Sequence, residues 1–287
     1  MEKETFDMGK IDIAWCPGCG NFAILSALKQ ALSELNIRPE RLVAVSGIGQ
    51  AAKAPHYYRC NLFNGLHGRT LPAATGIKAS NPELTVIAES GDGCSYAEGG
   101  NHFMHAIRRN PDITNIVHDN MVYGLTKGQA SPTTAPGFKT LVQREGVLHE
   151  SFNPLAAAVG LGASFVARAY AVDIPQTKEI LKKALLHKGY ALVDILQPCV
   201  TYNKVNNHPW YKEHTYYLDS SYDPGDRVQA MQKALQADKL PLGVLFLNPR
   251  PTFEEKLNVY REDRTPLYGR TPDPGRLAEW IDSTRGM

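Results

Sequence analysis

Two stretches of the sequence, residues 84–93 (LTVIAESGDG) and residues 113–124 (ITNIVHDNMVYG), decide the fold. Each begins with a continuous apolar run and ends in a cluster of Gly, Asp or Asn residues. Continuous short apolar runs are typical of strands that are buried on both faces of a parallel sheet. The segment between them has room for one helix, roughly residues 96–109. The two stretches therefore predict one strand–helix–strand unit.

The same alternation continues on both sides of this unit. Further short apolar runs, each predicted to be a strand, occupy residues 42–45, 164–167, 191–196 and 243–247. Helical patterns, with apolar residues three and four positions apart, lie between several of them. Apolar strands that alternate with helices predict an α/β fold with a doubly wound parallel sheet over residues 40–200.

The chain before this sheet is predicted to be a polar arm followed by one helix. Leucines recur at three- and four-residue steps after Asn21, which predicts an amphipathic helix with Asn21 as its N-cap. The pair Arg38-Pro39 closes this helix. Further along, residues 128–137 (GQASPTTAPG) are predicted to be a loop, because Pro, Gly and Thr dominate them.

The chain is expected to have three parts. They are a cysteine-bearing N-terminal arm (residues 1–20), an α/β domain (residues 21–200) and a C-terminal extension (residues 201–287). Polar and aromatic residues, and later Pro and charged residues, dominate the last part. It is expected to wrap over the main domain or over a partner.

Composition excludes several classes of protein. The 287 residues include 31 Lys and Arg against 29 Asp and Glu, so the net charge is 31 − 29 = +2, whereas nucleic-acid binding normally needs a basic surplus. No apolar stretch is long enough to predict a membrane span, and the N-terminus has no signal-peptide core. The five cysteines are an odd number and are too few for a disulfide framework. This favours a cytoplasmic protein.

Polar residues at the ends of the two deciding strands predict a metal–diphosphate site. Asp92 ends the first strand and Asn120 follows the second, so both belong at the carboxyl edge of the sheet, where α/β proteins bind ligands. The Asp92 carboxylate, the Asn120 amide oxygen and the Val122 carbonyl would give Mg²⁺ three oxygen ligands. Neighbouring glycines would let backbone N–H groups approach a diphosphate. The alternative is that Gly91-Asp92-Gly93 is only a turn.

A series of short motifs, in a fixed order along the chain, makes the sequence recognisable. The spacing from Gly-Asp-Gly to Asn-x-x-Tyr-Gly resembles the thiamine diphosphate-binding motif. More narrowly, the chain resembles the β subunit of two-subunit 2-oxoacid:ferredoxin oxidoreductases, the thiamine diphosphate-binding subunit of the pyruvate/2-oxoglutarate family. The motifs that carry this resemblance between about Ile11 and Glu255 include WCPGCGN (15–21), SGIG (46–49), LHGR (66–69), ATGIK (74–78), ESGDG (89–93), GGNHFMHAIRRN (99–110), DNMVYGLTKGQASPTT (119–134), QPC (197–199) and PRPTFEE (249–255).

The resemblance implies a reaction and its partners. A 2-oxoacid, such as 2-oxoglutarate or pyruvate, would undergo coenzyme A-dependent oxidative decarboxylation to acyl-CoA and CO₂, and the electrons would pass through an iron–sulfur cluster to ferredoxin. An α subunit would supply the glutamate that activates the cofactor, so the isolated chain would not turn over. The expected assembly is αβ or (αβ)₂, with no nucleic acid or membrane as a partner. The sequence does not identify the 2-oxoacid.

The resemblance also implies roles for single residues. Asp92, Asn120 and Val122 would be the magnesium ligands. Contacts with thiamine diphosphate are implied for Ile48, Gly49, Gln50, Ala51, His67, Gly91, Gly93, Cys94, Gly124 and Leu125. His67 would approach the diphosphate or the reacting carbonyl, and the alternative is a turn histidine. Lys53 is the candidate partner of a substrate carboxylate, and the alternative is a solvated surface lysine.

The pair Cys16 and Cys19 permits three interpretations. A Cys-x-x-Cys at the start of a helix is typical of a redox dithiol, but no βαβ strand precedes it. A zinc site would need a second pair of ligands. The third interpretation is an iron–sulfur cluster, for which thiolates are the natural ligands.

The resemblance favours a [4Fe–4S] cluster, with one departure. Cys16, Cys19 and Cys199 match three of its ligands, but Gln50 stands where the family has the cysteine of Ser-Gly-Ile-Gly-Cys. Cys60 could be a substitute ligand, Gln50 or another non-thiolate group could complete the cluster, or the cluster could be altered, labile or absent. The last case leaves an alternative function, a non-redox thiamine diphosphate-dependent decarboxylase or carboligase subunit. His102, His105 and His118 are expected to be packing or hydrogen-bonded residues.

Overall fold

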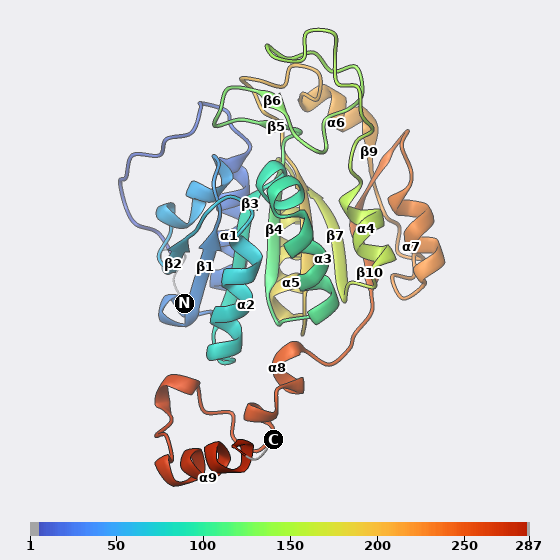
Figure 1. Ribbon diagram of the computed structural model, residues 1–287. Coiled ribbons are helices and arrows are strands. Elements are labelled where there is room, and N and C mark those ends of the chain that lie inside the picture. The colour runs from blue at the N-terminus through green and yellow to red at the C-terminus, as the bar shows by residue number, and fades with distance from the viewer. Residues whose placement is uncertain (1–5, 286–287) are drawn as a thin grey trace.

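The structure, a computed structural model that describes residues 6–285, is built on one eight-stranded sheet (Figure 1). The strands run in the order β2-β1-β3-β4-β8-β7-β10-β9. Their bounds are β1 (Leu42–Ser46), β2 (Asn61–Asn64), β3 (Thr85–Gly91), β4 (Thr114–Asp119), β7 (Phe165–Tyr170), β8 (Ala191–Leu196), β9 (Thr215–Tyr217) and β10 (Leu240–Leu247). From β2 to β7 all neighbours are parallel, whereas β10 is antiparallel to β7 and parallel to β9.

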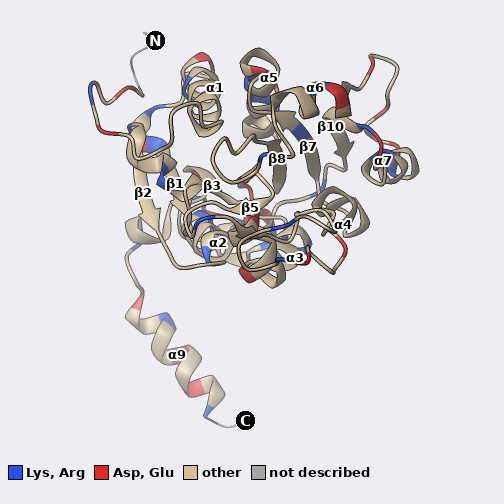
Figure 2. Cartoon of the chain, turned by 90° about the horizontal axis from the view of Figure 1, so that it is seen from above, with Lys and Arg blue, Asp and Glu red and all other residues tan. Residues whose placement is uncertain are grey.

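Helices cover both faces of the sheet, as Figure 2 shows from above. Apolar residues of α1 (Asn21–Glu34) and α5 (Ile174–Leu186) form a core with one face. The opposite face packs against α2 (Thr70–Ser80), α3 (Gly100–Arg109), α4 (Pro154–Gly160) and α7 (Arg227–Ala234). In the central strands, such as β1 and β3, alternate residues belong to different cores, because successive side chains point to opposite faces. The prediction of a doubly wound α/β sheet is therefore confirmed.

Three local predictions need correction. Gly20, not Asn21, is the N-cap of α1, because the Asn21 side chain is buried in a contact with β4. The predicted helix over 96–109 is divided at Gly99 into a π-helical turn, η3 (Gly93–Glu98), and α3. The predicted loop over 128–137 contains the short strand β6 (Gln129–Ala130), which pairs with β5 (Val122–Tyr123).

The expected boundary at residue 200 does not divide the structure. After it follow α6 (His208–His214) and β9, and then α7 and β10, and both strands belong to the main sheet. Pairing between β10 and β7 joins residues far apart in the sequence, which a strand prediction alone does not specify. The chain after β10 leaves the sheet. It carries α8 (Phe253–Lys256), the 3₁₀ turns η4 (Asn258–Tyr260) and η5 (Leu267–Gly269), and α9 (Pro274–Thr284), which projects from the body (Figure 1).

The remaining short elements are the 3₁₀ turns η1 (Pro39–Arg41) before β1 and η2 (Ala51–Tyr57) after it. Within residues 6–285, no helix combines the length and the apolar character that a membrane crossing requires.

Candidate active site

The two deciding strands are neighbours in the sheet. In the parallel pair of β3 and β4, Gly91 lies opposite His118. Asp92 follows β3 directly and begins the π-helical turn, and Asn120 follows β4. Both residues therefore lie at the carboxyl edge of the sheet, where the sequence predicted them.

A tight turn after β4 brings Asn120 and Val122 to the same side. The Asn120 Oδ1 atom accepts a hydrogen bond from the Val122 N–H at 3.0 Å, and Asp119 Oδ1 accepts one from the Met121 N–H at 3.2 Å. Met121 adopts a positive φ of 59°. Asx turns of this kind reverse the chain after the strand. A second lone pair on the Asn120 oxygen stays available for a ligand.

Two glycines shape the floor of the site. A Cβ atom on Gly93 would lie 2.4 Å from a ring carbon of Tyr123, so only glycine lets the Tyr123 ring cover this position. Gly49 has a φ of +124°, a conformation that residues with side chains rarely adopt. The same loop approaches the end of β3, where a Cβ atom on Gly91 would lie 3.9 Å from the Ala51 Cβ atom.

One cavity of about 60 Å³ brings the predicted cofactor and magnesium residues together. Its lining contains Ile48, Gly49, Gln50, Ala51, His67, Gly91, Asp92, Gly93, Cys94, Asn120, Val122, Gly124 and Leu125, together with Tyr123 and Thr126, which the sequence analysis did not select. We call this cavity the diphosphate pocket. Lys53 is not among its lining residues and belongs to η2, beyond Ala51.

Two hydroxyl groups that sequence reasoning missed hold the Asp92 carboxylate. Ser131 Oγ lies 2.5 Å and Thr133 Oγ1 2.7 Å from Asp92 Oδ2, and Thr133 Oγ1 is also 2.8 Å from Asp119 Oδ1. Both belong to the segment after β6. Ser, Pro and Thr in the run 128–137 indicated a loop, but no spacing rule connects this loop to Asp92.

The site concentrates buried acidic groups. Asp92, Asp119 and Asp194 are each at most 2% exposed. Burial raises the pKa of Asp92 to about 6, in spite of its hydrogen bonds from Ser131 and Thr133. Burial and the carboxylates of Asp194 and Asp92 raise the pKa of Asp119 well above its usual range. Since the Arg168 Nε atom, 3.5 Å from Asp194 Oδ1, brings one positive charge, a bound cation would relieve the remaining repulsion.

Three cysteines share a second cavity, which we call the cysteine pocket. Cys16 and Cys19 come from the N-terminal arm and Cys199 from the segment after β8, and all three line a cavity of about 140 Å³. Burial and the neighbouring thiols of Cys199 and Cys16 raise the pKa of Cys19. In residues 6–285, no three His, Cys, Asp or Glu side chains converge closely enough for a single metal ion. The cysteines of an iron–sulfur cluster bind different iron atoms and need no such convergence.

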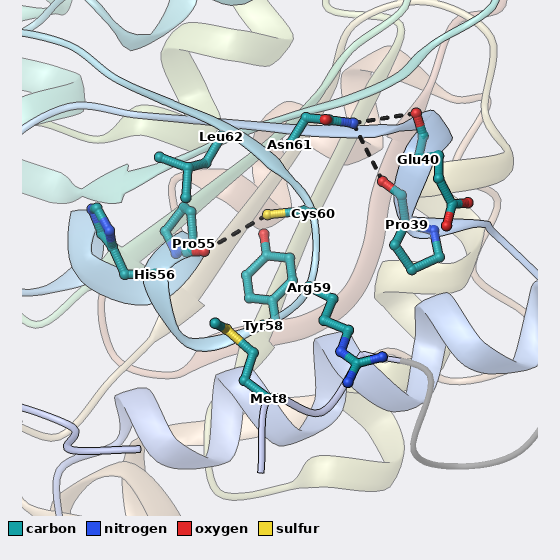
Figure 3. A pocket seen from close by; sticks show the side chains of 10 residues that line it. All are labelled: Met8, Pro39, Glu40, Pro55, His56, Tyr58, Arg59, Cys60, Asn61 and Leu62. Carbon is teal, nitrogen blue, oxygen red and sulfur yellow. Dashed lines mark hydrogen bonds between the residues drawn. The ribbon is translucent and has the colours of Figure 1, made fainter. Parts of the chain in front are cut away.

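The other two cysteines lie elsewhere. Figure 3 shows Cys60 in a separate shallow pocket, where its thiol faces the Pro55 carbonyl at 3.7 Å. Cys94 is 3% exposed, and its Sγ accepts a hydrogen bond from the Gly68 N–H at 3.2 Å. Cys94 therefore belongs to the wall of the diphosphate pocket, and Cys60 belongs to neither of the two pockets.

A buried hydrogen-bonded chain connects the sheet to the cysteine arm. His118 contacts Asn21 Oδ1 through Nδ1 at 2.8 Å and Glu89 Oε1 through Nε2 at 3.1 Å, and the Tyr58 hydroxyl donates to Glu89 Oε2 at 3.2 Å. All four side chains are at most 1% exposed. Asn21 also lines the cysteine pocket. His118 is therefore a hydrogen-bonded residue, as expected, but its link to the arm was not predictable.

Comparison with known proteins identifies this arrangement. Residues 44–195 match the thiamine pyrophosphate enzyme C-terminal TPP-binding domain, and residues 199–262 match the C-terminal region of the pyruvate ferredoxin oxidoreductase β subunit. A 2-oxoacid:ferredoxin oxidoreductase β subunit from a Sulfolobus species is 43% identical over 286 residues, which cover 93% of this chain and 94% of that protein. The chain belongs to the 2-oxoacid:ferredoxin oxidoreductase β-subunit family.

Other relatives agree with this family. The 2-oxoacid:ferredoxin oxidoreductase β subunit of Saccharolobus solfataricus is 45% identical over 281 residues, which cover 93% of this chain and 91% of that protein. A solved structure of 2-oxoglutarate:ferredoxin oxidoreductase from Magnetococcus marinus matches with a TM-score of 0.91 and 33% identity, over 98% of this chain and 96% of that one. The predicted family is therefore confirmed. This β subunit carries a thiamine diphosphate-binding domain and is part of an oxidoreductase.

Proposed function

We propose that the chain is the catalytic β subunit of an enzyme that converts a 2-oxoacid and coenzyme A to acyl-CoA and CO₂ and passes two electrons to ferredoxin. The observation that carries this proposal is the convergence of Asp92, Asn120 and Val122 with Gly93 at one cavity on the carboxyl edge of the sheet. Bound thiamine diphosphate would supply the carbanion chemistry. The chain's own task is to bind, orient and shield that cofactor.

Magnesium fits the donor set of the diphosphate pocket. Asp92 would contribute a carboxylate oxygen, Asn120 its amide oxygen and Val122 its backbone carbonyl, all of them hard ligands. Ser131 and Thr133 already hold Asp92 Oδ2, which leaves Oδ1 for the metal. The raised pKa of Asp92 describes the metal-free site, and a divalent cation would favour the ionised carboxylate.

Other pocket residues would divide the remaining tasks. The N–H groups around Gly93 and Gly124 are suited to the diphosphate, because no side chain keeps them at a distance. Leu125, 41% exposed at the pocket mouth, would pack on the thiazolium or on the substrate. His67 lines the same pocket and would donate to the diphosphate or to the substrate carbonyl. Lys53 stays a candidate for a substrate carboxylate from outside the pocket.

An α subunit is needed to complete the site. The cavity of about 60 Å³ is far below the roughly 300–1,000 Å³ of a typical ligand pocket. This small volume supports a second wall contributed by another chain, which would also bring the activating glutamate that the family resemblance implies. We propose an αβ or (αβ)₂ assembly.

The cysteine pocket fits a [4Fe–4S] cluster. Three thiols face one cavity, and this cavity shares Gln50, Asn120, Gly124 and Leu125 with the diphosphate pocket. A cluster held there would lie beside the cofactor, so electrons would travel a short path. The unpaired state of all five cysteines also fits a reducing compartment, and we propose the cytoplasm.

The substrate class follows from the relatives. The Magnetococcus marinus structure holds 2-oxoglutarate, coenzyme A and succinyl-CoA. We propose 2-oxoglutarate or pyruvate as the 2-oxoacid and coenzyme A as the acyl acceptor. One observation supports an alternative: Gln50 lines the cysteine pocket without a thiol, so a subunit with no cluster would act as a non-redox decarboxylase or carboligase.

A reconstitution experiment tests the proposal. The chain is produced with and without its α subunit, purified under anaerobic conditions and assayed with 2-oxoglutarate and with pyruvate. The complex should reduce ferredoxin only when coenzyme A, thiamine diphosphate and Mg²⁺ are present, and the β chain alone should be inactive. Full turnover by the isolated chain, or decarboxylation with no electron transfer, would contradict the proposal.

A further inference from the structure

Gln50 lies on the wall between the two pockets. It is one of the residues that line both the diphosphate pocket and the cysteine pocket. Its backbone carbonyl accepts a hydrogen bond from Trp15 Nε1 at 2.8 Å, which ties it to the residue that precedes Cys16. The loop that carries Gln50 is thus connected to the arm that carries two of the three thiols.

The side-chain oxygen of Gln50 is buried and has no partner. Gln50 Oε1 makes no hydrogen bond, although the atom is shielded from solvent. A buried carbonyl oxygen without a partner costs about 1–3 kcal/mol, so each such atom calls for a water, an ion or another group to satisfy it. The arrangement indicates that something outside the chain satisfies this oxygen.

The other amide side chains of the cysteine pocket already make hydrogen bonds. The Gln197 Nε2 atom donates to Cys19 Sγ at 3.4 Å, although its Oε1 has no partner. Asn21 Oδ1 contacts His118 at 2.8 Å, and Asn120 Oδ1 accepts from the Val122 N–H at 3.0 Å. Cys60 lines a different pocket. Among the amide side chains that line this pocket, Gln50 is therefore the best placed to act as a fourth ligand.

We propose that the Gln50 side-chain oxygen is the fourth ligand of an iron–sulfur cluster that Cys16, Cys19 and Cys199 hold through the other three irons. This inference rests on the cluster of the proposed function. A neutral carbonyl oxygen binds iron more weakly than a thiolate, because iron–sulfur clusters favour soft donors. The oxygen-bound iron would consequently be the labile one.

The lability gives a direct test. One-electron oxidation by ferricyanide converts [4Fe–4S]²⁺ to [3Fe–4S]⁺ with release of one Fe²⁺, if one iron lacks a thiolate. The complex with the α subunit is purified under anaerobic conditions as wild type, Gln50→Cys and Gln50→Ala, with Gln232→Ala, at an exposed glutamine on α7, as the matched control. Iron content, Mössbauer spectra and electron paramagnetic resonance spectra are recorded before and after one equivalent of ferricyanide.

Wild type and Gln232→Ala should hold about four irons per β chain, lose about a quarter of them to ferricyanide and show a three-iron signal. Gln50→Cys should keep all its iron, and Gln50→Ala should be isolated with about three. The inference is overturned if wild type resists ferricyanide as Gln50→Cys does, or if Gln50→Ala keeps the wild-type iron content. Circular dichroism and thiamine diphosphate binding verify that each variant folds.

These outcomes also separate this inference from the proposed function. Iron absent from wild type, with thiamine diphosphate still bound, would overturn the cluster and the Gln50 ligand together and would favour the non-redox alternative. Normal iron behaviour with no oxidation of any 2-oxoacid would support the ligand and contradict the proposed reaction.

Discussion

The two pockets of this subunit are built in different ways, although they share a wall. Side chains of the diphosphate pocket are held before any ligand arrives: two hydroxyls fix Asp92 Oδ2, and a backbone N–H fixes Asn120 Oδ1. The cysteine pocket combines thiols from an arm without helices or strands and from a loop, and it contains two buried oxygens that lack partners. The sheet organises the first pocket, whereas a bound cluster, if our proposal holds, would organise the second.

This difference has an energetic meaning. Preorganised ligands cost little entropy on binding, so the diphosphate pocket should bind Mg²⁺ and cofactor in proportion to its contacts. A cluster in the cysteine pocket would instead fix the arm, and its binding energy would appear as local stability. The predictions below test whether the two pockets respond independently.

The largest effect is expected from Asp92→Ala. Without this carboxylate, Mg²⁺ loses its charged ligand, and Mg²⁺-dependent binding of thiamine diphosphate should fall below detection in isothermal titration calorimetry of the complex. The iron content should stay at the wild-type value, because Asp92 does not line the cysteine pocket. Asp282→Ala, on the exposed helix α9, is the matched control. Loss of iron together with cofactor would show that the pockets are not independent.

A scaffold variant should disturb both pockets equally. Lys78 is buried and its Nζ lies 2.9 Å from Asp112 Oδ2, so Lys78→Met leaves a largely buried carboxylate without this partner. The expected loss of unfolding free energy is about 3 kcal/mol, which urea denaturation at pH 7 measures. Arg285→Met, from an exposed ion pair, should cost less than about 1 kcal/mol.

The same pair predicts a pH dependence. Burial raises the pKa of Asp112, but the Lys78 ammonium outweighs it, so the pKa is lowered below its ordinary value of 3.8. The contribution to stability is complete above that unfolded-state pKa and is lost as pH falls through the folded-state value. Between pH 5 and the lowest pH measured, the unfolding free energy of Lys78→Met should therefore fall less than that of wild type. Parallel acid-unfolding curves for the two proteins would contradict this assignment.

A smaller effect is expected from the hydroxyls behind Asp92. The double variant Ser131→Ala, Thr133→Val keeps the carboxylate but removes the two donors that orient it. Metal affinity should fall about 10–100-fold, as for other residues that orient metal ligands. Titration with Mg²⁺ at saturating thiamine diphosphate measures the shift. Ser80→Ala on the exposed surface of α2 is the control, and unchanged affinity in the double variant would exclude the orienting role.

The smallest effect should come from Cys60→Ser. Its thiol faces Pro55 in a separate pocket, so iron content and turnover should match wild type within error. Cys199→Ser, in the cysteine pocket, should lose the cluster. Iron loss in both variants would indicate that Cys60 is a cluster ligand.

The pattern of apolar residues in the sequence was sufficient to predict the central strands of this fold. Parallel strands buried on both faces leave continuous apolar runs, so the strand order around Asp92 and Asn120 could be anticipated. The antiparallel position of β10 beside β7 could not be anticipated. The two strands are distant in sequence, so their pairing leaves no local signal. The N-cap prediction at Asn21 was wrong because a buried contact with His118 outweighed the local preference for capping.

The residues of the candidate site were predictable where their role depends on residue type and on a position at the end of a strand. Asp92, Asn120 and the glycines follow from that logic. Ser131 and Thr133 reach the site through the β5–β6 hairpin, whose path depends on the conformation of Met121 and on the cover that Tyr123 forms over Gly93. Contacts that depend on the path of a loop in the folded protein leave no signal in local sequence patterns.

The place of β10 in the sheet has a consequence for biosynthesis. β9 joins the sheet through β10, and β10 is completed only at Leu247. Until the ribosome has released that strand, β7 presents an open, aggregation-prone edge, while the segments that form both pockets are already synthesised. A nascent chain that ends before residue 240 would therefore contain the segments of both pockets while the β7 edge of the sheet is still unpaired.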